Sequence, residues 1–291
     1  MPLLSLVVCV HNQRDLLERL LRHSAGCYDD LVVLHDIPDA TGVRAVVEAV
    51  GGRFFERPPS FLQEPHWPFA WEQAAHDWIL RLDADEFPSA ELKEWLQKFR
   101  QSPEPDKFVS GFTCIWPLWN GQQAVTKNWP TGRFFLFHRR QVRFFGMCEQ
   151  SPIPEGKCEP LNLVLHHEPP NRKTYGLQNM LMRKQSRRGR KFIARCLLGK
   201  PTDLVCWRWE DESWPAVWEQ IRRQPLRTAF EWLTLEPLRT LRRQWKFERR
   251  FFFTDAIGGG VFRAMTCLAY WQMKRRARRV SGAGERRHAG G

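Results

Sequence analysis

Two aspartates one residue apart, Asp83 and Asp85, are the residues whose types and spacing most clearly allow chemistry. They follow a short, mostly apolar run that begins at Trp78, and Glu86 comes directly after them. Two neighbouring carboxylates can hold a hard divalent cation, Mg²⁺ or Mn²⁺, that also binds the phosphates of a substrate. The same acids would suit a solvated turn that opens the next helix, because acids are favoured near a helix N-terminus. The pattern alone leaves both interpretations open.

The run that precedes the aspartates has the character of a buried strand, and similar runs occur earlier in the chain. Apolar stretches at 3–10, 31–34 and 53–56 alternate with segments of helical periodicity. Strands that alternate with helices predict a parallel sheet with right-handed crossovers. Ligands bind at the carboxyl ends of the strands in such sheets, where Asp83 and Asp85 would lie. The first hundred residues therefore predict an α/β layer of the nucleotide-binding type.

The middle of the chain changes to strand-like pieces without a clear linker. These pieces lie at 108–118, 133–138, 142–145 and 161–165. They predict an antiparallel addition to the same sheet, within one domain that spans 1–170. A basic helical extension is expected over 171–280, and the Gly-rich end, 281–291, is expected to be disordered.

The charge of the chain is unevenly distributed. The net charge is +13, but residues 1–165 carry a net charge of −4 and residues 166–291 carry +17. The second part therefore favours a polyanionic partner, which could be nucleic acid, an anionic membrane surface or a phosphorylated acceptor. Composition does not choose among these three.

Cysteine spacing and hydropathy bear on the compartment. The eight cysteines include no C-x-x-C pair, which is typical of reduced thiols in a cytosolic protein. The N-terminus lacks the basic start of a secretory signal. No apolar run reaches the ~18 to 20 residues that a membrane-spanning helix needs. These patterns predict a cytoplasmic protein.

Basic clusters lie beside aromatic residues from Arg239 to Arg279. Between them, residues 256–271 are mostly apolar, but as a helix they would extend only about 24 Å, which is too short to cross a bilayer. This combination predicts a helix that lies in the membrane interface, with its cations on anionic headgroups. The alternative is a helix that packs against the rest of the protein.

Three blocks of the sequence resemble the family-2 glycosyltransferases. The segment LSLVVCVHN is similar to the first strand of that family, LVVLHDIPDATG to its second strand and acidic turn, and WILRLDADE to its metal-binding D-x-D strand. The branch that transfers sugars to the lipopolysaccharide inner core is the most similar. That branch has a W-P-x-x-x-R-x-F-like block, matched by 129–137, a V-H-E-like block, matched by 147–149, and a basic helical tail.

The resemblance implies a fold, an activity and a set of site residues. The fold would be the GT-A type of nucleotide-diphospho-sugar transferase, a mostly parallel sheet flanked by helices, with the basic helical C-terminal extension. The activity would be metal-dependent, inverting transfer of a sugar to a hydroxyl group. Asp83 and Asp85 would hold Mg²⁺ or Mn²⁺, while Asp36, Asn12 and Asp83 would bind the nucleotide sugar. Glu149 would be the general base.

Some residues depart from the family pattern. Many relatives have Gln or Asn before the D-x-D strand, where this chain has Glu64-Pro65-His66-Trp67-Pro68. Cys148 stands where the lipopolysaccharide branch has His, which leaves Glu149 as the proton acceptor of that block. His166 and His167 match the downstream His of the family only loosely, and we expect a structural role for both.

The expected partners follow from the same resemblance. They are a nucleotide-sugar donor, a glycolipid or lipopolysaccharide-core acceptor and an anionic membrane surface, with the protein peripheral on the cytoplasmic face of the inner membrane. Nucleic acid is not expected as a partner, because the sequence has no recognisable RNA- or DNA-binding motif. Two alternatives stay open. One is a nucleic-acid-binding protein, and the other is an inactive interaction protein that has kept the transferase fold.

Overall fold

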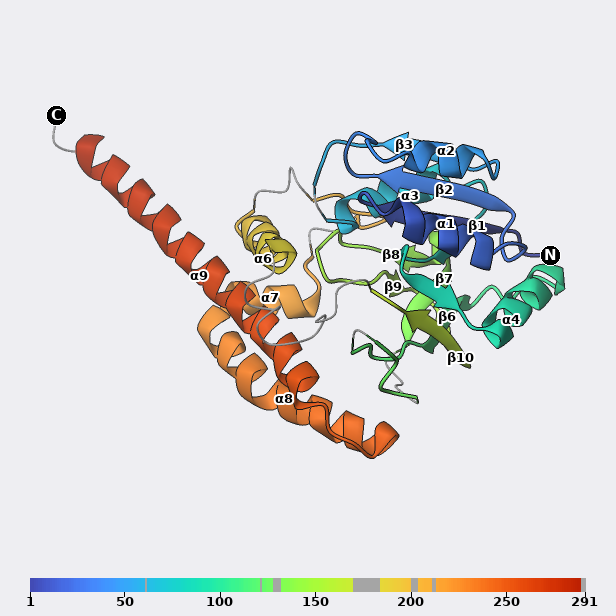
Figure 1. The fold of residues 1–291 in the computed structure, drawn as a ribbon. Helices are drawn as coiled ribbons and strands as arrows, with labels where there is room; N and C mark the ends of the chain where they lie inside the picture. Colours follow the sequence, from blue (N-terminus) through green and yellow to red (C-terminus); the bar gives the residue numbers. More distant parts are fainter. Residues whose placement is uncertain are drawn as a thin grey trace. The chain divides into compact units, whose positions relative to one another are not determined.

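A computed structural model describes residues 1–60, 62–120, 122–127, 132–169, 184–199, 204–210 and 213–288 (Figure 1). The chain divides into two compact units. Unit 1 consists of Met1–Thr174 and Val205–Trp209, and unit 2 of Tyr175–Leu204 and Glu210–Gly291. The return of Val205–Trp209 to unit 1 has no signal in the sequence pattern.

Unit 1 is built on an eight-stranded sheet in the order β3-β2-β1-β4-β7-β6-β10-β5. Its first half is parallel: β1 pairs with β2 and β4, and β2 pairs with β3. These strands are β1 (Leu4–Val10), β2 (Asp30–His35), β3 (Arg53–Glu56) and β4 (Trp78–Arg81). The order 3-2-1-4 matches the first four strands of the doubly wound nucleotide-binding order 3-2-1-4-5-6. The predicted parallel α/β layer is therefore confirmed.

Helices cover both faces of this sheet, and each face has its own core. Leu6 and Val8 of β1 point to the core shared with α1 (Arg14–His23), α2 (Val43–Glu48) and α4 (Ala90–Gln101). Val7 and Cys9 point to the opposite core, where α3 (Trp67–Gln73) packs after a short 3-10 turn, η1 (Glu64–His66). Every residue of β1 is buried, as the continuous apolar run predicts for a central parallel strand.

The second half of the sheet is mixed, and it confirms the predicted antiparallel addition. Strand β7 lies antiparallel between β4 and β6, β6 pairs in parallel with β10, and β10 pairs antiparallel with β5. The bounds are β5 (Glu86–Pro88), β6 (Val109–Ile115), β7 (Arg133–His138) and β10 (Lys157–His167). A turn η2 (Arg139–Gln141) leads to a small ribbon, β8 (Val142–Arg143) with β9 (Ile153–Pro154). The long β10 returns the chain to the segment that follows Asp85.

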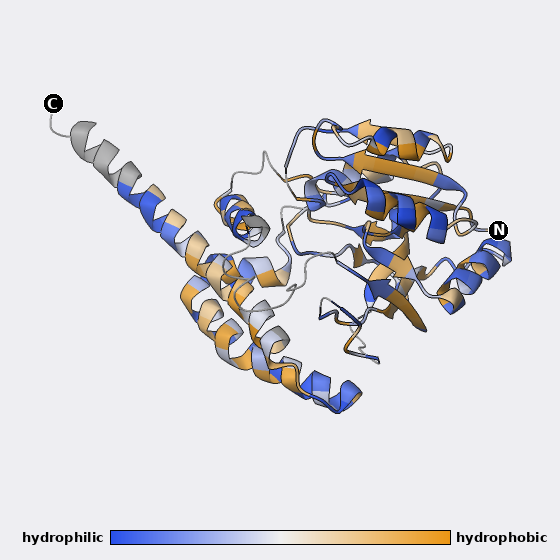
Figure 2. Ribbon diagram, viewed as in Figure 1, coloured by the Kyte–Doolittle hydropathy of each residue, from blue (hydrophilic) through white to orange (hydrophobic). Residues whose placement is uncertain are grey.

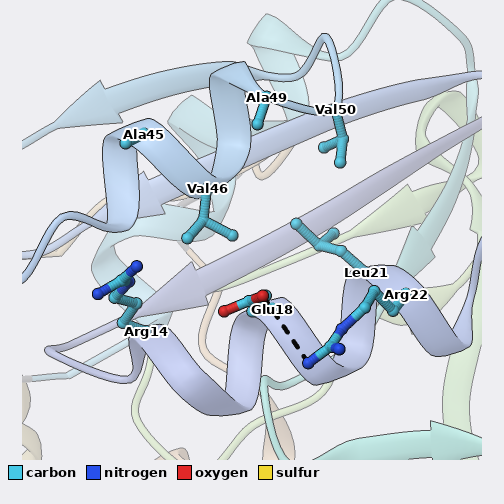
Figure 3. Close-up of a pocket in the computed structure, with 8 residues that line it drawn as sticks. All are labelled: Arg14, Glu18, Leu21, Arg22, Ala45, Val46, Ala49 and Val50. Atoms are coloured by element: carbon cyan, nitrogen blue, oxygen red, sulfur yellow. Dashed lines mark ion pairs between the residues drawn. The ribbon is translucent and has the colours of Figure 1, made fainter.

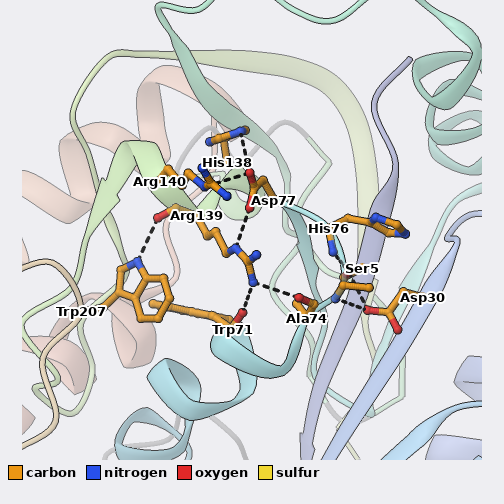
Figure 4. Close-up of polar contacts among 11 residues, drawn as sticks. Ser5, Asp30, Trp71, Ala74, His76, Asp77, His138, Arg139, Arg140 and Trp207 are labelled. Carbon is orange, nitrogen blue, oxygen red and sulfur yellow. Dashed lines mark hydrogen bonds and ion pairs between the residues drawn. The ribbon is translucent and has the colours of Figure 1, made fainter.

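A polar network at the amino-terminal end of β4 joins distant segments of unit 1 (Figure 4). The Arg139 guanidinium donates to the carbonyl oxygens of Trp71 and Ala74 at 2.5 and 3.0 Å, and to Asp77 Oδ1 at 2.8 Å. Trp207 Nε1 donates to the Arg139 carbonyl at 2.9 Å. Backbone hydrogen bonds between Phe144 and Trp207 complete the attachment of 205–209.

Unit 2 is helical, with α6 (Lys184–Leu197), α7 (Ala216–Arg223), α8 (Pro225–Glu248) and α9 (Phe253–His288). Helices α8 and α9 form an antiparallel hairpin (Figure 1). They cross closely at Gly260, where an added Cβ would lie 2.3 Å from the Trp232 carbonyl oxygen. Helix α9 continues to His288, past residue 281, where the sequence analysis expected a disordered tail to begin. None of the described helices is long and apolar enough to cross a membrane.

The apolar segment 256–271 lies within α9 and supplies core residues of unit 2. Ala256, Phe262, Cys267 and Tyr270 are all buried. Arg263 lies over the rings of two tryptophans of α7 and α8. Ile257 and Met265 of the same segment are 40 and 37% exposed. The segment therefore packs within unit 2 on one face, as the alternative expects, and its placement in the membrane interface stays a prediction.

Candidate active site at the carboxyl ends of the strands

Asp83 and Asp85 lie in the turn between β4 and β5, at the carboxyl end of β4. The turn is closed by two hydrogen bonds: Asp83 N–H donates to Glu86 Oε2 at 2.8 Å, and Glu86 N–H donates to the Asp83 carbonyl at 3.0 Å. The two aspartate side chains are 22 and 15% exposed. They are therefore held at the rim of the sheet, accessible in part to a ligand.

Glu86 differs from its neighbours because it is fully buried in β5. The sequence placed it with the two aspartates at the rim, but pairing of β5 with β10 turns its side chain into the protein. Trp116 Nε1 donates to Glu86 Oε1 at 2.9 Å. Burial raises the pKa of Glu86, the nearby charge of Arg133 opposes this, and Asp83 adds to the rise.

Arg133 joins Glu86 to Asp83. Its Nη2 donates to Asp83 Oδ2 at 2.7 Å, and its Nε lies 3.1 Å from Glu86 Oε1. Burial would lower the pKa of Arg133, but the two carboxylates outweigh burial and raise it. The guanidinium is therefore a fixed positive charge at the rim, on the first residue of β7.

Asp85 has a different neighbour, His167, at the end of β10. His167 Nε2 lies 3.6 Å from Asp85 Oδ2, and the imidazole stacks on Trp116 with ring centroids 4.3 Å apart. His167 Nδ1 is buried without a hydrogen-bond partner among the described residues. We expected only a structural role for this histidine, but it lies beside the second aspartate of the D-x-D pair.

A second polar group lies at the end of β2. Asp36 is buried, and its Oδ1 is 2.7 Å from His11 Nδ1 at the end of β1. His66 Nε2 is 3.9 Å from the other Asp36 oxygen. Burial lowers the pKa of His66 to about 4, so that it is neutral near pH 7. Asn12 follows in a left-handed conformation, φ 52°, and its N–H donates to His35 Nε2 at 3.3 Å.

Glu149 is exposed, in a left-handed conformation with φ 60°. Its backbone N–H donates to Glu64 Oε1 at 2.8 Å, so the first residue of η1 and the predicted base are linked. Burial and the charge of Glu149 raise the pKa of Glu64 to about 7. The carboxyl groups of Glu64 and Glu149 therefore lie in the same part of the molecule, and that of Glu64 changes protonation near neutral pH.

The buried thiol of Cys9 lies near the carboxyl end of β1, between the two strands that Asp36 and Asp83 follow. Its pKa is raised by burial and then by the charges of three carboxylates, Asp83, Asp36 and Glu64, against the opposing charge of Arg81. Arg81 is itself buried, and burial lowers its pKa to about 9. Carboxylates from three separate loops therefore act on a single buried atom at one edge of the sheet.

The donors present suit a divalent cation that a substrate would help to bind. No group of three or more His, Cys, Asp or Glu among the described residues is arranged to hold a metal ion alone. Asp83 and Asp85 offer carboxylate oxygens, and His167 adds an imidazole within reach of Asp85. Mg²⁺ in particular is commonly held by one or two carboxylates together with substrate phosphates. The residues therefore fit a metal whose remaining ligands come from a diphosphate and water.

A separate pocket of about 310 Å³ lies between α1 and α2 (Figure 3). Its walls are mostly apolar, with Glu18 and Arg22 forming an ion pair at 3.8 Å. It is lined by Arg14, Glu18, Leu21, Arg22, Ala45, Val46, Ala49 and Val50. None of the predicted site residues is among them, so this pocket is distinct from the carboxylate edge.

Comparisons with known proteins find structural likenesses at low sequence identity. No protein-family model and no curated protein matches the chain. Among solved structures, S. aureus TarS in complex with UDP-GlcNAc (residues 1–349) is 12% identical and covers 95% of this chain and 92% of its own, with a TM-score of 0.40. A longer TarS structure is 11% identical over 92% of this chain, with a TM-score of 0.37. CMP:2-keto-3-deoxy-manno-octonic acid synthetase with CTP is 14% identical over 40% of this chain, with a TM-score of 0.30.

This chain spans about half the length, 54%, of both the longer TarS chain and the synthetase chain. Since all three TM-scores lie below 0.5, these likenesses carry no argument about activity.

Sequence analysis did not assign a role to Arg133 or to Glu64. Both had a signal: Arg133 is the arginine of the W-P-x-x-x-R block, and Glu64 begins the stretch that departs from the family before the D-x-D strand. Trp129, Pro130 and Thr131 of that block lie outside the described residues. The signals gave positions, but only the sheet brings Arg133 to Asp83.

Proposed function

We propose that this protein is an inverting glycosyltransferase that moves a sugar from a nucleotide diphospho-sugar to a hydroxyl group. The observation that carries the proposal is the group Asp36, Asp83, Asp85 and Arg133, which lies at one edge of the sheet, where β2 and β4 end and the antiparallel β7 begins. This edge of an open α/β sheet is where nucleotides bind. Acids paired with a fixed guanidinium suit a substrate that carries both hydroxyls and phosphates.

Each of these residues would have its own role in binding the donor. Asp36 and Asn12 would hold the nucleoside, with Asp36 kept in place by its 2.7 Å contact to His11. Asp83 and Asp85 would hold Mg²⁺ or Mn²⁺, which when bound would neutralise the diphosphate charge. Arg133 would fix the orientation of Asp83 through its 2.7 Å hydrogen bond.

Glu149 is the proposed general base. Its carboxylate would take the proton of the acceptor hydroxyl while the oxygen bonds to the anomeric carbon. The bond from that carbon to the diphosphate breaks, and the leaving phosphate oxygen keeps the electron pair. Attack from the side opposite the diphosphate inverts the anomeric centre. Glu64 would position Glu149 through its 2.8 Å hydrogen bond to the backbone N–H.

The acceptor is proposed to be a glycolipid, such as a lipopolysaccharide core, at the cytoplasmic face of the inner membrane. The net charge of +17 over residues 166–291 supports this location, since anionic headgroups and phosphorylated sugars both attract cations. The resemblance of the blocks at 129–137 and 147–149 to the lipopolysaccharide branch supports the acceptor class.

A ligand screen by thermal unfolding tests the donor. UDP-, GDP- and ADP-hexoses are each added with and without Mn²⁺, because a ligand that binds only the folded state raises its melting temperature. We expect one nucleotide class to stabilise the protein, and Mn²⁺ to be required. Asp85→Asn should abolish the Mn²⁺-dependent shift, while Asp15→Asn, the same change at an exposed position of α1, should retain it. The absence of any shift in the whole screen would contradict the proposal.

A further inference from the structure

The turn between α8 and α9 exposes three aromatic side chains that pack on one another. The rings of Trp245 and Phe251 stack with centroids 5.3 Å apart, and Phe251 and Phe253 are 5.8 Å apart. These residues are 49, 48 and 59% exposed. We refer to residues 245–253 as the hairpin tip. Because adjacent exposed apolar groups mark interaction surfaces, this cluster indicates a binding surface.

The hairpin tip is held in shape by hydrogen bonds. The buried side chain of Gln244 accepts from the Phe252 N–H at 2.8 Å and donates to the Phe252 carbonyl at 3.3 Å. Arg249 ends α8 in a left-handed conformation, φ 55°, with its N–H donating to the Trp245 carbonyl at 3.2 Å. The aromatic cluster is therefore presented by a defined turn, at little further cost in conformational entropy on binding.

Cations surround the cluster. Residues 239–250 contain six arginines and lysines and one acid, a net charge of +5. Lys246, Arg249 and Arg250 are exposed. Figure 2 shows the strongly hydrophilic end of the α8–α9 hairpin where these residues lie. Aromatic rings below a layer of cations are the arrangement that proteins use at membrane interfaces.

We propose that the hairpin tip, Trp245–Phe253, is the surface that binds an anionic lipid bilayer, with the three rings at the acyl boundary and the cations at the phosphates. This inference rests on the membrane location proposed above and names the residues responsible for it. It moves the contact from segment 256–271, where Phe262, Cys267 and Tyr270 are buried, to the hairpin tip. The charge of +5 beside the rings selects an anionic over a neutral surface.

Ring packing favours lipid over single-stranded nucleic acid as the partner. Bases bind by stacking on free aromatic faces. Trp245 and Phe251 already stack on each other, with an interplanar angle of 17°, and the Arg249 guanidinium lies 5.9 Å from the Trp245 centroid. The outer edges of such a cluster can enter the headgroup region without any rearrangement.

Vesicle cosedimentation of the full chain tests the proposal, with phosphatidylcholine vesicles with and without phosphatidylglycerol. Trp245→Ser/Phe251→Ser/Phe253→Ser should lower partitioning into anionic vesicles about tenfold or more, at low and high salt alike. Phe108→Ser is the matched control, since Phe108 is 66% exposed with Lys107 beside its ring, and should leave partitioning unchanged. Lys246→Gln/Arg250→Gln should lose about fivefold per cation, only with anionic lipid and at low salt.

Each outcome separates this inference from the wider proposal. If the wild-type chain binds no vesicle, the membrane location fails as well, whereas the nucleotide-sugar screen still tests the transferase. If the wild type binds and the triple variant binds equally well, the hairpin tip is not the anchor. Tighter binding to a single-stranded oligonucleotide, or a dimer in solution, that is lost in the triple variant would also overturn the assignment. Circular dichroism of each variant checks that unit 2 stays helical.

Discussion

The two ends of β4 carry the same residue types in opposite proportions. At the amino-terminal end, one carboxylate, Asp77, pairs with two arginines, Arg139 at 2.8 Å and Arg140 at 2.9 Å. At the carboxyl end, a single guanidinium, Arg133, pairs with both Asp83 and Glu86. The first network has cations in excess, and the second has carboxylates in excess.

The partners of the arginines explain the difference. Arg139 donates hydrogen bonds to the carbonyl oxygens of Trp71 and Ala74. Its guanidinium therefore joins the segment after β7 to the end of α3. At the other end, the additional carboxylate, Asp85, has no arginine or lysine partner among the described residues and lies 3.6 Å from the imidazole of His167. An excess of acids at a partly open rim can accept an external cation, whereas a guanidinium bound to carbonyls has little left to offer a ligand. The same chemistry is thus structural at one end and available for function at the other.

The largest expected effect concerns the carboxyl end of β4, where Asp83 and Asp85 lie. Asp85→Asn removes a charge that no arginine needs, so we expect sugar transfer to be abolished with the melting temperature almost unchanged. Steady-state assays with the donor identified by the screen, with Mn²⁺ varied, measure the loss. Asp15→Asn is the control at an exposed helix position. Wild-type turnover by Asp85→Asn with the same Mn²⁺ dependence would contradict the role of this end.

Next in size is the proposed base. Glu149→Gln keeps the backbone hydrogen bond to Glu64 but cannot accept a proton, so we expect kcat to fall by ~10²- to 10⁴-fold. Donor affinity, measured by the thermal shift, should stay nearly constant. A loss of less than tenfold would move the base to another carboxylate, with Asp83 the next to test.

A substitution at the amino-terminal end of β4 should change the stability of the protein and not its turnover. Arg139→Ala leaves Asp77 without one of its cations and frees two backbone carbonyls, which should lower the free energy of unfolding by about 3 kcal/mol. Because Arg139 lies at the opposite end of β4 from Asp83, kcat of the folded fraction should not change. Urea unfolding and active-site titration measure the two quantities separately. A fall in kcat without a fall in stability would remove the contrast between the two ends.

Local pattern predicted most of the first half of the fold and the places of the key acids. The runs that became β1, β2 and β4 and the position of Asp83, Asp85 and Asp36 at strand ends follow from periodicity and from the parallel arrangement. Sequence could not show that β5 pairs with β10, because that contact joins residues 77 to 81 positions apart. Burial of Glu86 and the approach of His167 both depend on that pairing.

Unit 2 shows the same limit. Hydropathy alone marked 256–271 as the apolar helix of the membrane interface, but α9 returns antiparallel along α8 and buries part of that segment, while Trp245 and Phe251 are exposed. Which of two apolar segments faces solvent is a property of their packing, and composition does not contain it. The predicted basic surroundings apply to both segments, because both lie among the same arginines.

The smallest expected effect is a change in the pH dependence of stability at Glu64. Burial and the charge of Glu149 raise its pKa in the folded protein to about 7, above the value of about 4.3 for an unfolded chain. Between these values the folded state keeps a proton that the unfolded state has released, so stability falls as pH rises through this window and levels off above it.

Glu64→Gln still accepts the Glu149 N–H but does not titrate. We therefore expect its melting temperature, relative to wild type, to rise by a few degrees from pH 5 to pH 7 and then to stay constant. Glu72→Gln, the same change at an exposed position of α3, should follow wild type throughout. Parallel curves for Glu64→Gln and wild type would mean that the carboxyl is already ionised at pH 5, and that the charge balance near Glu149 differs from the one argued here.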